Sequence, residues 1–203
     1  MSIKKLNNDR RVRRTKQSLK DALLSLIQER ELKDIAITDI VNRADLNRGT
    51  FYKHYHYKED LLEEMIEDVL QDLIKSYREP YYDVDTLIIG ELSSSAIKIF
   101  EHIAKYSTFY KVIFKLNMVP GFQNRIFHEL KKLAMYDLTY YDSNPKVNRE
   151  IHASYHTYAV LGMVIEWVNE DFKYSPQYMA EQLIEIINER PSKVVLKTTG
   201  HRV

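Results

Sequence analysis

Cysteine is absent from the 203 residues of this chain, which also has only five glycines, five prolines and one tryptophan. A chain without cysteine suits the reducing cytosol and offers no thiolate to a metal ion. The few glycines make tight catalytic turns scarce, and the sequence contains no glycine-rich phosphate loop, no nucleophile elbow and no HExxH motif. We therefore expect no catalytic residues and no cofactor, and we expect that the protein is not an enzyme.

Long hydrophobic runs are absent as well. The longest, Tyr158 to Ile165, is far shorter than the roughly 20 residues that a membrane-spanning helix needs. The N-terminus is charged throughout and lacks the apolar stretch of a secretory signal. These features predict a soluble, cytoplasmic protein.

Charge is distributed unevenly along the chain, although the formal net charge is only +1. Residues 1–57 hold 13 Lys and Arg against 7 Asp and Glu, whereas residues 58–203 hold 17 against 22. This asymmetry indicates that only the N-terminal part meets a polyanion. A basic cluster near the N-terminus is typical of an arm that contacts the minor groove or phosphates: Arg10, Arg11, Arg13 and Arg14. The alternative is a solvated leader, and both interpretations hold if the arm becomes ordered only on DNA.

Residues 38–57 show the pattern of two short helices separated by a tight turn. Thr38 is a favourable N-cap, and the apolar residues after it lie on one side of a helix: Ile40, Val41 and Ala44. Asp45 and Asn47 interrupt this helix, because Asp and Asn side chains bond to the local backbone, and Asn47 is suited to cap the helix that follows. The spacing predicts a helix-turn-helix.

The second helix of this motif has one buried and one exposed face. Phe51 and Tyr55, four residues apart, lie one above the other and face the protein. The outward residues lack large aliphatic side chains: Gly49, Thr50 and Lys53, with Tyr52 and His54 on the flanks. An ordinary amphipathic helix with a solvated polar face is the alternative, but the helix-turn-helix spacing favours insertion into the major groove of DNA.

The expected DNA contacts follow from this outward face. Gly49 lets the backbone approach the groove closely. Side chains placed to reach base edges or phosphates are Arg48, Thr50 and Lys53. Side chains expected to hold phosphates and set the register are Tyr52, His54 and Lys58. Thr38 completes the predicted DNA-binding set.

The motif closely resembles the helix-turn-helix of tetracycline-repressor-type (TetR/AcrR) bacterial transcriptional regulators. The matching positions are Thr38, Ile40, Ala44, Gly49, Tyr52, His54, Tyr55, Lys58 and Leu61. Two positions depart from the family pattern: Asp45 stands where the turn usually has glycine, and Asn47 stands where the second helix usually has a serine cap. Asn caps as well as Ser, and Asp adopts turn conformations at modest cost, so the same fold is expected.

The resemblance extends upstream, where Arg13 and Arg14 lead into a helix with one apolar face, and downstream to residues 155–176, which are similar to a subgroup common in Firmicutes. It implies an all-α fold with an N-terminal three-helix DNA-binding domain and a C-terminal helical bundle used for dimerisation and effector binding. It also implies a homodimer that binds a palindromic operator on double-stranded DNA as an effector-responsive repressor.

Helical periodicity continues beyond the motif, and the prolines fall between the periodic segments. Residues 58–78 have apolar residues at helical spacing and are predicted to connect the DNA-binding domain, residues 1–57, to the C-terminal domain, residues 79–190. Residues 191–203 are expected to form a frayed tail. Within the C-terminal domain we expect helices over residues 84–106, 108–116, 121–141, 145–172 and 176–190.

The last two of these helices carry apolar residues on more than one side, so one core cannot cover them. Packing against their copies would form a four-helix interface, in which Ala159 and Gly162 permit close approach. The residues predicted for this dimer interface are Tyr155, Tyr158, Ala159, Gly162, Met163, Met179, Leu183 and Ile187. The alternative is that both helices are central in the monomer.

The segment between the connecting helix and the dimer helices is rich in aromatic residues, from which an effector pocket would be built. No single residue is assigned to this ligand. Effector binding would tilt the 58–78 helix and lower operator affinity. The alternative is a protein partner on the acidic C-terminal part, which would make the protein a co-regulator or activator.

One histidine pair is spaced for metal binding. His152 and His156 offer two imidazoles four residues apart, but the sequence places no third or fourth ligand beside them. No metal site is therefore predicted, and the two residues are interpreted as satisfied or surface histidines.

Overall fold

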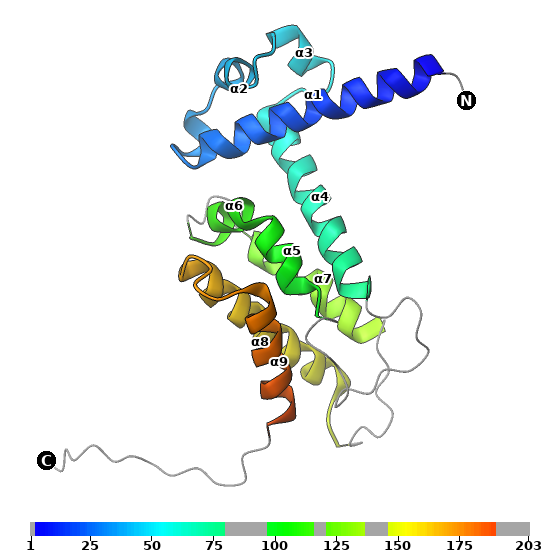
Figure 1. Cartoon of the computed structure of the whole chain (residues 1–203), viewed down its shortest axis with the longest axis vertical. Helices are drawn as coiled ribbons and strands as arrows, with labels where there is room; N and C mark the ends of the chain where they lie inside the picture. Colours follow the sequence, from blue (N-terminus) through cyan, green and yellow to red (C-terminus); the bar gives the residue numbers. More distant parts are fainter. Residues whose placement is uncertain (1–2, 80–96, 116–120, 137–145, 190–203) are drawn as a thin grey trace, which may run out of the picture.

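The computed structural model describes residues 3–79, 97–115, 121–136 and 146–189. All regular elements within these ranges are helices, so the predicted all-α class is confirmed (Figure 1). The N-terminal elements are α1 (Ile3–Ile27), the 3-10 turn η1 (Leu32–Asp34), α2 (Ile37–Arg43), α3 (Arg48–Tyr52) and α4 (Lys58–Arg78). The C-terminal elements are α5 (Ile99–Lys105), α6 (Ser107–Tyr110), the π-helical turn η5 (Lys111–Lys115), α7 (Phe122–Tyr136), α8 (Arg149–Asn169) and α9 (Pro176–Asn188).

α4 runs from the N-terminal helices to the C-terminal bundle (Figure 1). Its bounds coincide with the 58–78 segment deduced from apolar periodicity. At its start, Asp60 Oδ2 accepts the backbone N–H groups of His56 and Tyr57, both at 2.9 Å, which satisfies two donors that a helix N-terminus leaves unpaired. At its end, Lys75 and Arg78 lie in the last turn, where positive charge is favourable. The sequence therefore defines both ends of this helix locally.

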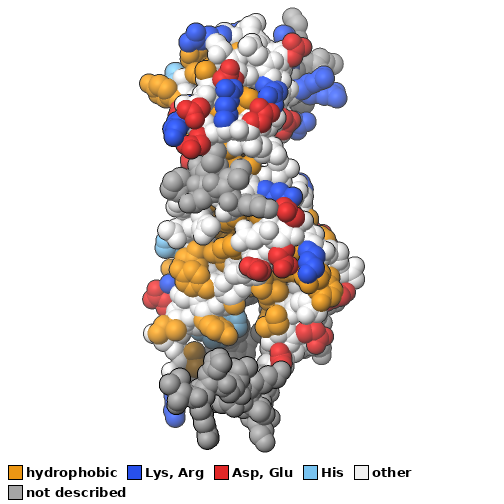
Figure 2. Space-filling model, turned by 90° about the vertical axis from the view of Figure 1, so that its left-hand side faces the viewer, with side chains coloured by type: hydrophobic (Ala, Val, Ile, Leu, Met, Phe, Trp, Pro, Cys, Tyr) orange, Lys and Arg blue, Asp and Glu red, His pale blue; other side chains and the backbone are white. Residues whose placement is uncertain are grey.

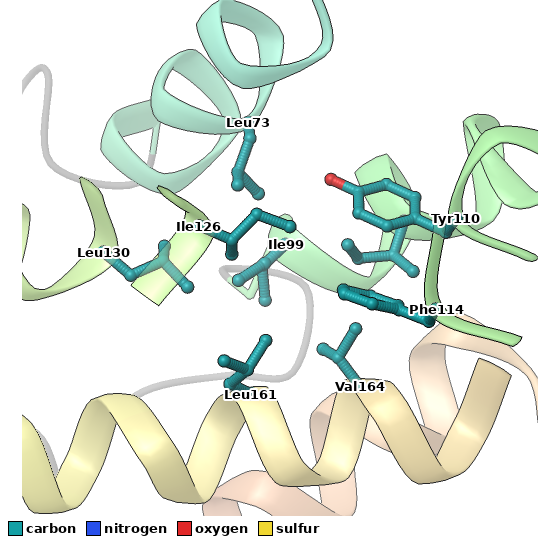
Figure 3. Close-up of a pocket in the computed structure, with 9 residues that line it drawn as sticks. Leu73, Ile99, Tyr110, Phe114, Ile126, Leu130, Leu161 and Val164 are labelled. Atoms are coloured by element: carbon teal, nitrogen blue, oxygen red, sulfur yellow. The ribbon is translucent and has the colours of Figure 1, made fainter. Parts of the chain in front are cut away.

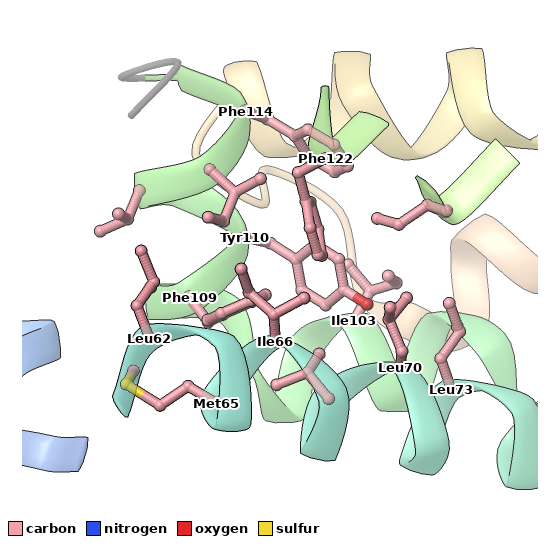
Figure 4. Close-up of a cluster of buried hydrophobic side chains, with 14 of the residues drawn as sticks. Leu62, Met65, Ile66, Leu70, Leu73, Ile103, Phe109, Tyr110, Phe114 and Phe122 are labelled. Carbon is pink, nitrogen blue, oxygen red and sulfur yellow. The ribbon is translucent and has the colours of Figure 1, made fainter. Parts of the chain in front are cut away.

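One hydrophobic core extends through both ends of the molecule, and α4 contributes to all of it. Figure 4 shows side chains of α4 packed against the bundle; the labelled residues are Leu62, Met65, Ile66, Leu70, Leu73, Ile103, Phe109, Tyr110, Phe114 and Phe122. At the other end, Leu61 of α4 joins the buried residues of α1 to α3. Each such side chain contributes about 1.5–3 kcal/mol on burial. The N-terminal helices and the bundle are therefore coupled by packing.

Several predicted helices are shorter or divided in the structure. The predicted helix over residues 108–116 is divided, in its described part, into α6 and η5, and five of its residues are buried: Phe109, Tyr110, Val112, Ile113 and Phe114. An α-helix cannot direct five such neighbours to one core, whereas the wider π turn changes the direction of the side chains. Predicted helical residues 84–96, 116, 137–141, 145 and 190 and the predicted tail 191–203 lie outside the described residues.

The turn between α8 and α9 has left-handed backbone at two consecutive residues, Asp171 with φ 57° and Phe172 with φ 59°. The Phe172 N–H donates to the Trp167 carbonyl at 2.9 Å. The Trp167 indole, which is 2% exposed, donates through Nε1 to the Tyr174 carbonyl at 3.0 Å. This buried tryptophan therefore fixes the turn and, through it, the placement of α9 after α8.

Candidate DNA-binding surface

Asp45 and Asn47 set the geometry of the turn between α2 and α3. Asp45 has φ 53°, in the left-handed region that glycine favours and that Asp enters at modest cost. The Asn47 side chain caps α3, since its Oδ1 accepts from the Thr50 backbone N–H at 2.9 Å and from the Thr50 hydroxyl at 3.0 Å. The predicted cap is confirmed, and it places the start of α3 at Arg48.

Two buried aromatic side chains hold α3 against the protein. Phe51 is 0% exposed and Tyr55 is 4% exposed, with ring centroids 5.6 Å apart, as the four-residue spacing predicts. The backbone N–H groups of His54 and Tyr55 donate to the Phe51 carbonyl at 2.9 and 3.0 Å. α3 itself is shorter than the predicted helix, because it ends at Tyr52 and Lys53 is its C-cap.

The outward side of α3 carries the residues predicted to meet DNA. The exposed ones are Arg48, Gly49, Tyr52 and Lys53, and the partly buried ones are Thr50 and His54. Arg48 Nη2 donates to the Tyr52 hydroxyl at 3.0 Å, and the guanidinium lies 5.4 Å from the Tyr52 ring centroid. These two side chains therefore form one continuous polar edge. Figure 1 places α3 at the end of the molecule remote from α8 and α9.

Thr38 is not the N-cap of α2, and this prediction is wrong. α2 begins at Ile37, and Asp39 completes its start, because Asp39 Oδ2 accepts the Ala36 N–H at 2.9 Å. The same carboxylate pairs with Arg30 at 2.8 Å. A carboxylate at the third helical position satisfies the backbone before the helix, so α2 starts two residues earlier than expected, with Ala36 as its N-cap. Thr38 is exposed in the first turn.

The Lys58 ammonium is engaged with the protein backbone. Its Nζ donates to the carbonyl oxygens of Leu32 at 2.6 Å, Ile35 at 2.7 Å and Lys33 at 3.2 Å. An ammonium group has three donors, and this arrangement uses all three. Lys58 therefore ties the start of α4 to η1 and the approach to α2, a positioning role that differs from the predicted phosphate contact.

We expect Lys58→Met to lower the free energy of unfolding by about 1.5–3 kcal/mol, because hydrogen bonds to a charged donor contribute roughly that much. Chemical denaturation would measure the change. The matched control is Lys53→Met, which removes an exposed lysine of the same region and should change stability by less than about 0.5 kcal/mol. Equal, small effects of the two substitutions would contradict the positioning role.

Two lysines of α1 clamp α4 close to α3. Lys16 Nζ lies 2.7 Å from Glu64, while Lys20 Nζ lies 2.7 Å from Glu64 and 2.5 Å from Asp68. Burial alone would raise the pKa of Glu64, but the hydrogen bonds from both lysines outweigh it and hold that pKa below its usual value. This clamp was not predicted from the sequence, where its signal is Lys20 directly beside Leu19 of the apolar face. The structure leaves Lys20 only 8% exposed.

A second polar cluster ties α4 to the bundle. The side chain of His102 is 0% exposed, and its Nδ1 lies 3.0 Å from Asp72 Oδ2 of α4, which also pairs with Lys105 at 2.9 Å. Its Nε2 lies 2.9 Å from the Tyr110 hydroxyl. Burial lowers the pKa of His102, although Asp72 opposes this effect. Because a carboxylate only accepts, Nδ1 carries the proton, and Nε2 of the neutral ring accepts from Tyr110.

Most described side chains of the aromatic segment predicted to hold an effector are buried in the core, although Tyr136 is 82% exposed. The enclosed apolar cavity within it has a volume of only about 10 Å³, which is the space of a single water molecule. Figure 3 shows its lining, drawn from α4, α5, α6, η5, α7 and α8: Leu73, Ile99, Ile103, Tyr110, Phe114, Ile126, Leu130, Leu161 and Val164. A larger, polar cleft of about 390 Å³ lies between α4 and α5 beside Asp72 and His102.

The predicted dimer residues separate into two groups. The exposed group is Tyr155, Tyr158, Ala159, Gly162 and Ile187, and Met163 is partly buried. Met179 and Leu183 are each 8% exposed and belong to the protomer's own core. The interface prediction is corrected for these two, because α9 packs that side against α5. Ile186 and Ile187, about one turn further along the same stripe of α9, are 54% and 38% exposed, and Figure 2 shows hydrophobic side chains gathered on the bundle.

In the described parts of the chain, no helix combines the length and apolar character needed to cross a membrane.

Two family models match the chain. The model described as "Bacterial regulatory proteins, tetR family" matches residues 19–65, and the model described as "Transcriptional regulator C-terminal region" matches residues 90–189. The chain is also similar to the "Uncharacterized HTH-type transcriptional regulator YxbF" of Bacillus subtilis (strain 168), with 23% identity over 172 residues. That match covers 85% of this chain and 44% of the relative, so the chain spans less than half of that protein.

Two solved structures have a similar fold. One is the TetR transcriptional regulator from Streptococcus agalactiae 2603V, at 20% identity and a TM-score of 0.58, covering 90% of this chain and 98% of that one. The other is the dihydroxyacetone kinase operon activator DhaS, at 17% identity and a TM-score of 0.57, covering 86% of this chain and 94% of that one. At such identities the similarity shows the fold.

Proposed function

Because the chain belongs to the TetR family of bacterial transcriptional regulators, we propose that it binds a palindromic operator in the cytoplasm as a homodimer and represses transcription until an effector reaches the bundle. The family is a class of DNA-binding proteins without enzymatic activity, in agreement with the missing catalytic motifs. The observation that carries the proposal is the polar edge of Arg48 and Tyr52, which α3 presents outward from its buried anchor Phe51.

In this proposal α3 enters the major groove with its outward side. Gly49 has no side chain to separate the backbone from the DNA, while Arg48 and Lys53 flank it on the exposed surface. An arginine that extends along Tyr52 is already ordered, so little side-chain freedom is lost when it meets a base edge or phosphate. The charge asymmetry supports the same orientation, since the surplus of Lys and Arg lies in residues 1–57.

The proposed dimer uses the exposed apolar face of α8 and α9. Ile151 and Tyr155 are each 69% exposed, and Tyr158 is 58% exposed although its ring stacks on Phe127 of α7 at 4.0 Å. Large apolar side chains gathered on one face mark interaction surfaces. A two-fold dimer would place the two α3 helices in major grooves about 34–36 Å apart, or a multiple of that spacing.

The effector is proposed to act through α4. Leu73 of α4 lines the small apolar cavity together with residues of the bundle. An apolar effector that entered there would have to enlarge the cavity, because its present volume of about 10 Å³ holds no more than a water molecule. Enlargement would press on α4, change the separation of the two α3 helices and lower operator affinity.

The DNA-binding proposal is tested by selecting bound fragments from a random pool and measuring the affinity of the enriched palindrome by fluorescence anisotropy. We expect Lys53→Ala to cost about 1–3 kcal/mol on the preferred sequence and to relax preference at one position of each half-site. Unchanged affinity and preference in this variant would show that α3 does not dock as proposed. The control is Lys132→Ala, an exposed lysine of α7 that should leave both unchanged.

The salt dependence of operator affinity distinguishes lysines that contact phosphates from lysines that position parts of the protein. Affinity should fall steeply, with a log-log slope of about −0.9 for each phosphate contacted. Lys58→Met should leave that slope unchanged, since its ammonium is occupied by three carbonyl oxygens. A flat salt response of the unaltered protein would argue against DNA as the partner.

A further inference from the structure

Two histidines on α8 place their ring nitrogens side by side. His152 Nε2 and His156 Nε2 are 3.0 Å apart, and the two ring centroids are 4.3 Å apart at 65°. Both side chains are partly buried on the flank of α8, beside the exposed Tyr155, whose ring lies 5.2 Å from that of His156. The one-turn spacing of the sequence is therefore realised as a close pair of nitrogens that share one side of the helix.

We propose that His152 and His156 form a two-nitrogen binding site for a divalent transition-metal ion, with Cu²⁺ or Ni²⁺ as the preferred occupant. In the metal-free protein one ring donates its Nε2 proton to the lone pair of the other. Metal binding requires the donating ring to change tautomer, so that its proton moves from Nε2 to Nδ1 and both Nε2 lone pairs point to the ion. The accepting ring already carries its proton on Nδ1, so the neutral pair releases no net proton.

The distance between the two nitrogens is compatible with binding of one ion by both rings. Two nitrogen ligands about 2.0–2.1 Å from an ion are about 2.8–3.0 Å apart at adjacent corners of a square, and about 3.3–3.4 Å apart in a tetrahedron. The observed 3.0 Å is the length of the hydrogen bond in the metal-free pair, and it needs little change to reach adjacent positions of the square or tetragonal geometry that Cu²⁺ and Ni²⁺ favour. Tetrahedral Zn²⁺ would require the rings to separate by a few tenths of an ångström.

The two imidazoles supply only part of the coordination sphere of such an ion, each through the lone pair that a neutral ring offers. Within the described residues no group of three or more potential ligands converges, so the remaining coordination positions are assigned to water molecules. This makes the site an open one, in which the metal keeps exchangeable ligands.

The test is a titration of the untagged full-length chain with Cu²⁺, Ni²⁺ and Zn²⁺, followed by calorimetry and by electron paramagnetic resonance for Cu²⁺. We expect one ion per chain, affinity in the order Cu²⁺, Ni²⁺, Zn²⁺, and nitrogen splitting from two ring nitrogens. His152→Ala and His156→Ala should each lower Cu²⁺ affinity at least about tenfold and remove one nitrogen from the spectrum. Circular dichroism would establish that both variants keep their helices.

The matched control is His128→Ala, which removes an exposed histidine of α7 and should leave stoichiometry, affinity and spectrum unchanged. Retention of the two-nitrogen spectrum in the double variant His152→Ala/His156→Ala would overturn the proposal. Weak binding that is lost equally in His128→Ala would overturn it as well, because it would show only surface association. Neither outcome depends on DNA binding.

Discussion

Phe51→Ala is expected to abolish operator binding and to lower the free energy of unfolding by about 3–5 kcal/mol, the usual cost of removing a buried aromatic ring. α3 has only five residues, far fewer than the roughly 12–15 that an isolated helix needs to be even marginally stable in water. Its position therefore depends on its cap and on its buried side chains. Phe51 is 0% exposed and packs against Tyr55 at 5.6 Å between ring centroids. Without this ring, the outward edge of α3 has no fixed orientation.

Thermal unfolding and anisotropy on the selected palindrome measure the two parts of this prediction. Phe51→Leu is the control, because a smaller but still large apolar side chain retains most of the burial and should preserve folding and measurable DNA binding. Tyr52→Ala is the opposite control: it removes an exposed ring, so stability should change little while affinity falls. Wild-type DNA affinity in folded Phe51→Ala would contradict the anchoring role.

His102→Ala is expected to lower the free energy of unfolding by about 2–4 kcal/mol. The substitution leaves the buried Tyr110 hydroxyl without the acceptor that it has at 2.9 Å, and an unpaired buried polar group costs about 1–3 kcal/mol. The lost ring also leaves a void in the core. Asp72 loses one donor but keeps Lys105 at 2.9 Å, so the carboxylate is not left unpaired.

A second substitution separates the hydrogen bond from the void. Tyr110→Phe should destabilise the unaltered protein by about 1 kcal/mol, because it removes the donor to His102 Nε2. In the His102→Ala background it should instead restore stability, because it removes the unpaired hydroxyl. A double-mutant cycle by urea denaturation measures this change of sign. Simple addition of the two losses would show that the histidine and tyrosine are not coupled.

The same histidine also gives stability a pH dependence. Burial lowers the pKa of His102 in the folded protein, whereas in the unfolded chain it titrates near its ordinary value of about 6.5. As the pH falls, the unfolded chain takes up this proton first, so stability decreases below about pH 6.5. His102→Asn keeps a donor toward Asp72 without titrating, and the loss of stability between about pH 7.5 and 5.5 should be smaller in that variant.

Local patterns in the sequence were sufficient for several elements of the fold. Phe51 and Tyr55 are buried as their spacing predicts, Asn47 caps α3, and α4 has the predicted bounds. Each of these depends on residues within one or two helical turns. The hydrogen bond from the Ala36 N–H to the Asp39 side chain, which fixes the start of α2, is equally local. Thr38 and Asp39 are both polar residues suited to a helix N-terminus, and the pattern alone does not show which of them stabilises it.

Features that depend on distant residues were not predictable from these patterns. The carbonyl partners of Lys58 lie 23 to 26 residues upstream, so its positioning role requires the tertiary arrangement. Met179 and Leu183 are buried while Ile186 and Ile187 are exposed, although helical spacing puts all four on one stripe of α9, so the pattern does not show where along that stripe the core ends. The spacing of His152 and His156 was evident in the sequence, but the 3.0 Å between their nitrogens depends on the rotamers that their surroundings select.

The hydrophobic core is continuous along α4 from the N-terminal helices to the bundle, and this continuity has a genetic consequence. Since the N-terminal helices and the bundle are packed on one helix, a destabilising substitution deep in the bundle also reduces the fraction of molecules that can bind DNA. Losses of only 1–2 kcal/mol change protein abundance several-fold in cells. Mutants isolated for loss of regulation should therefore include many bundle positions that touch neither DNA nor effector.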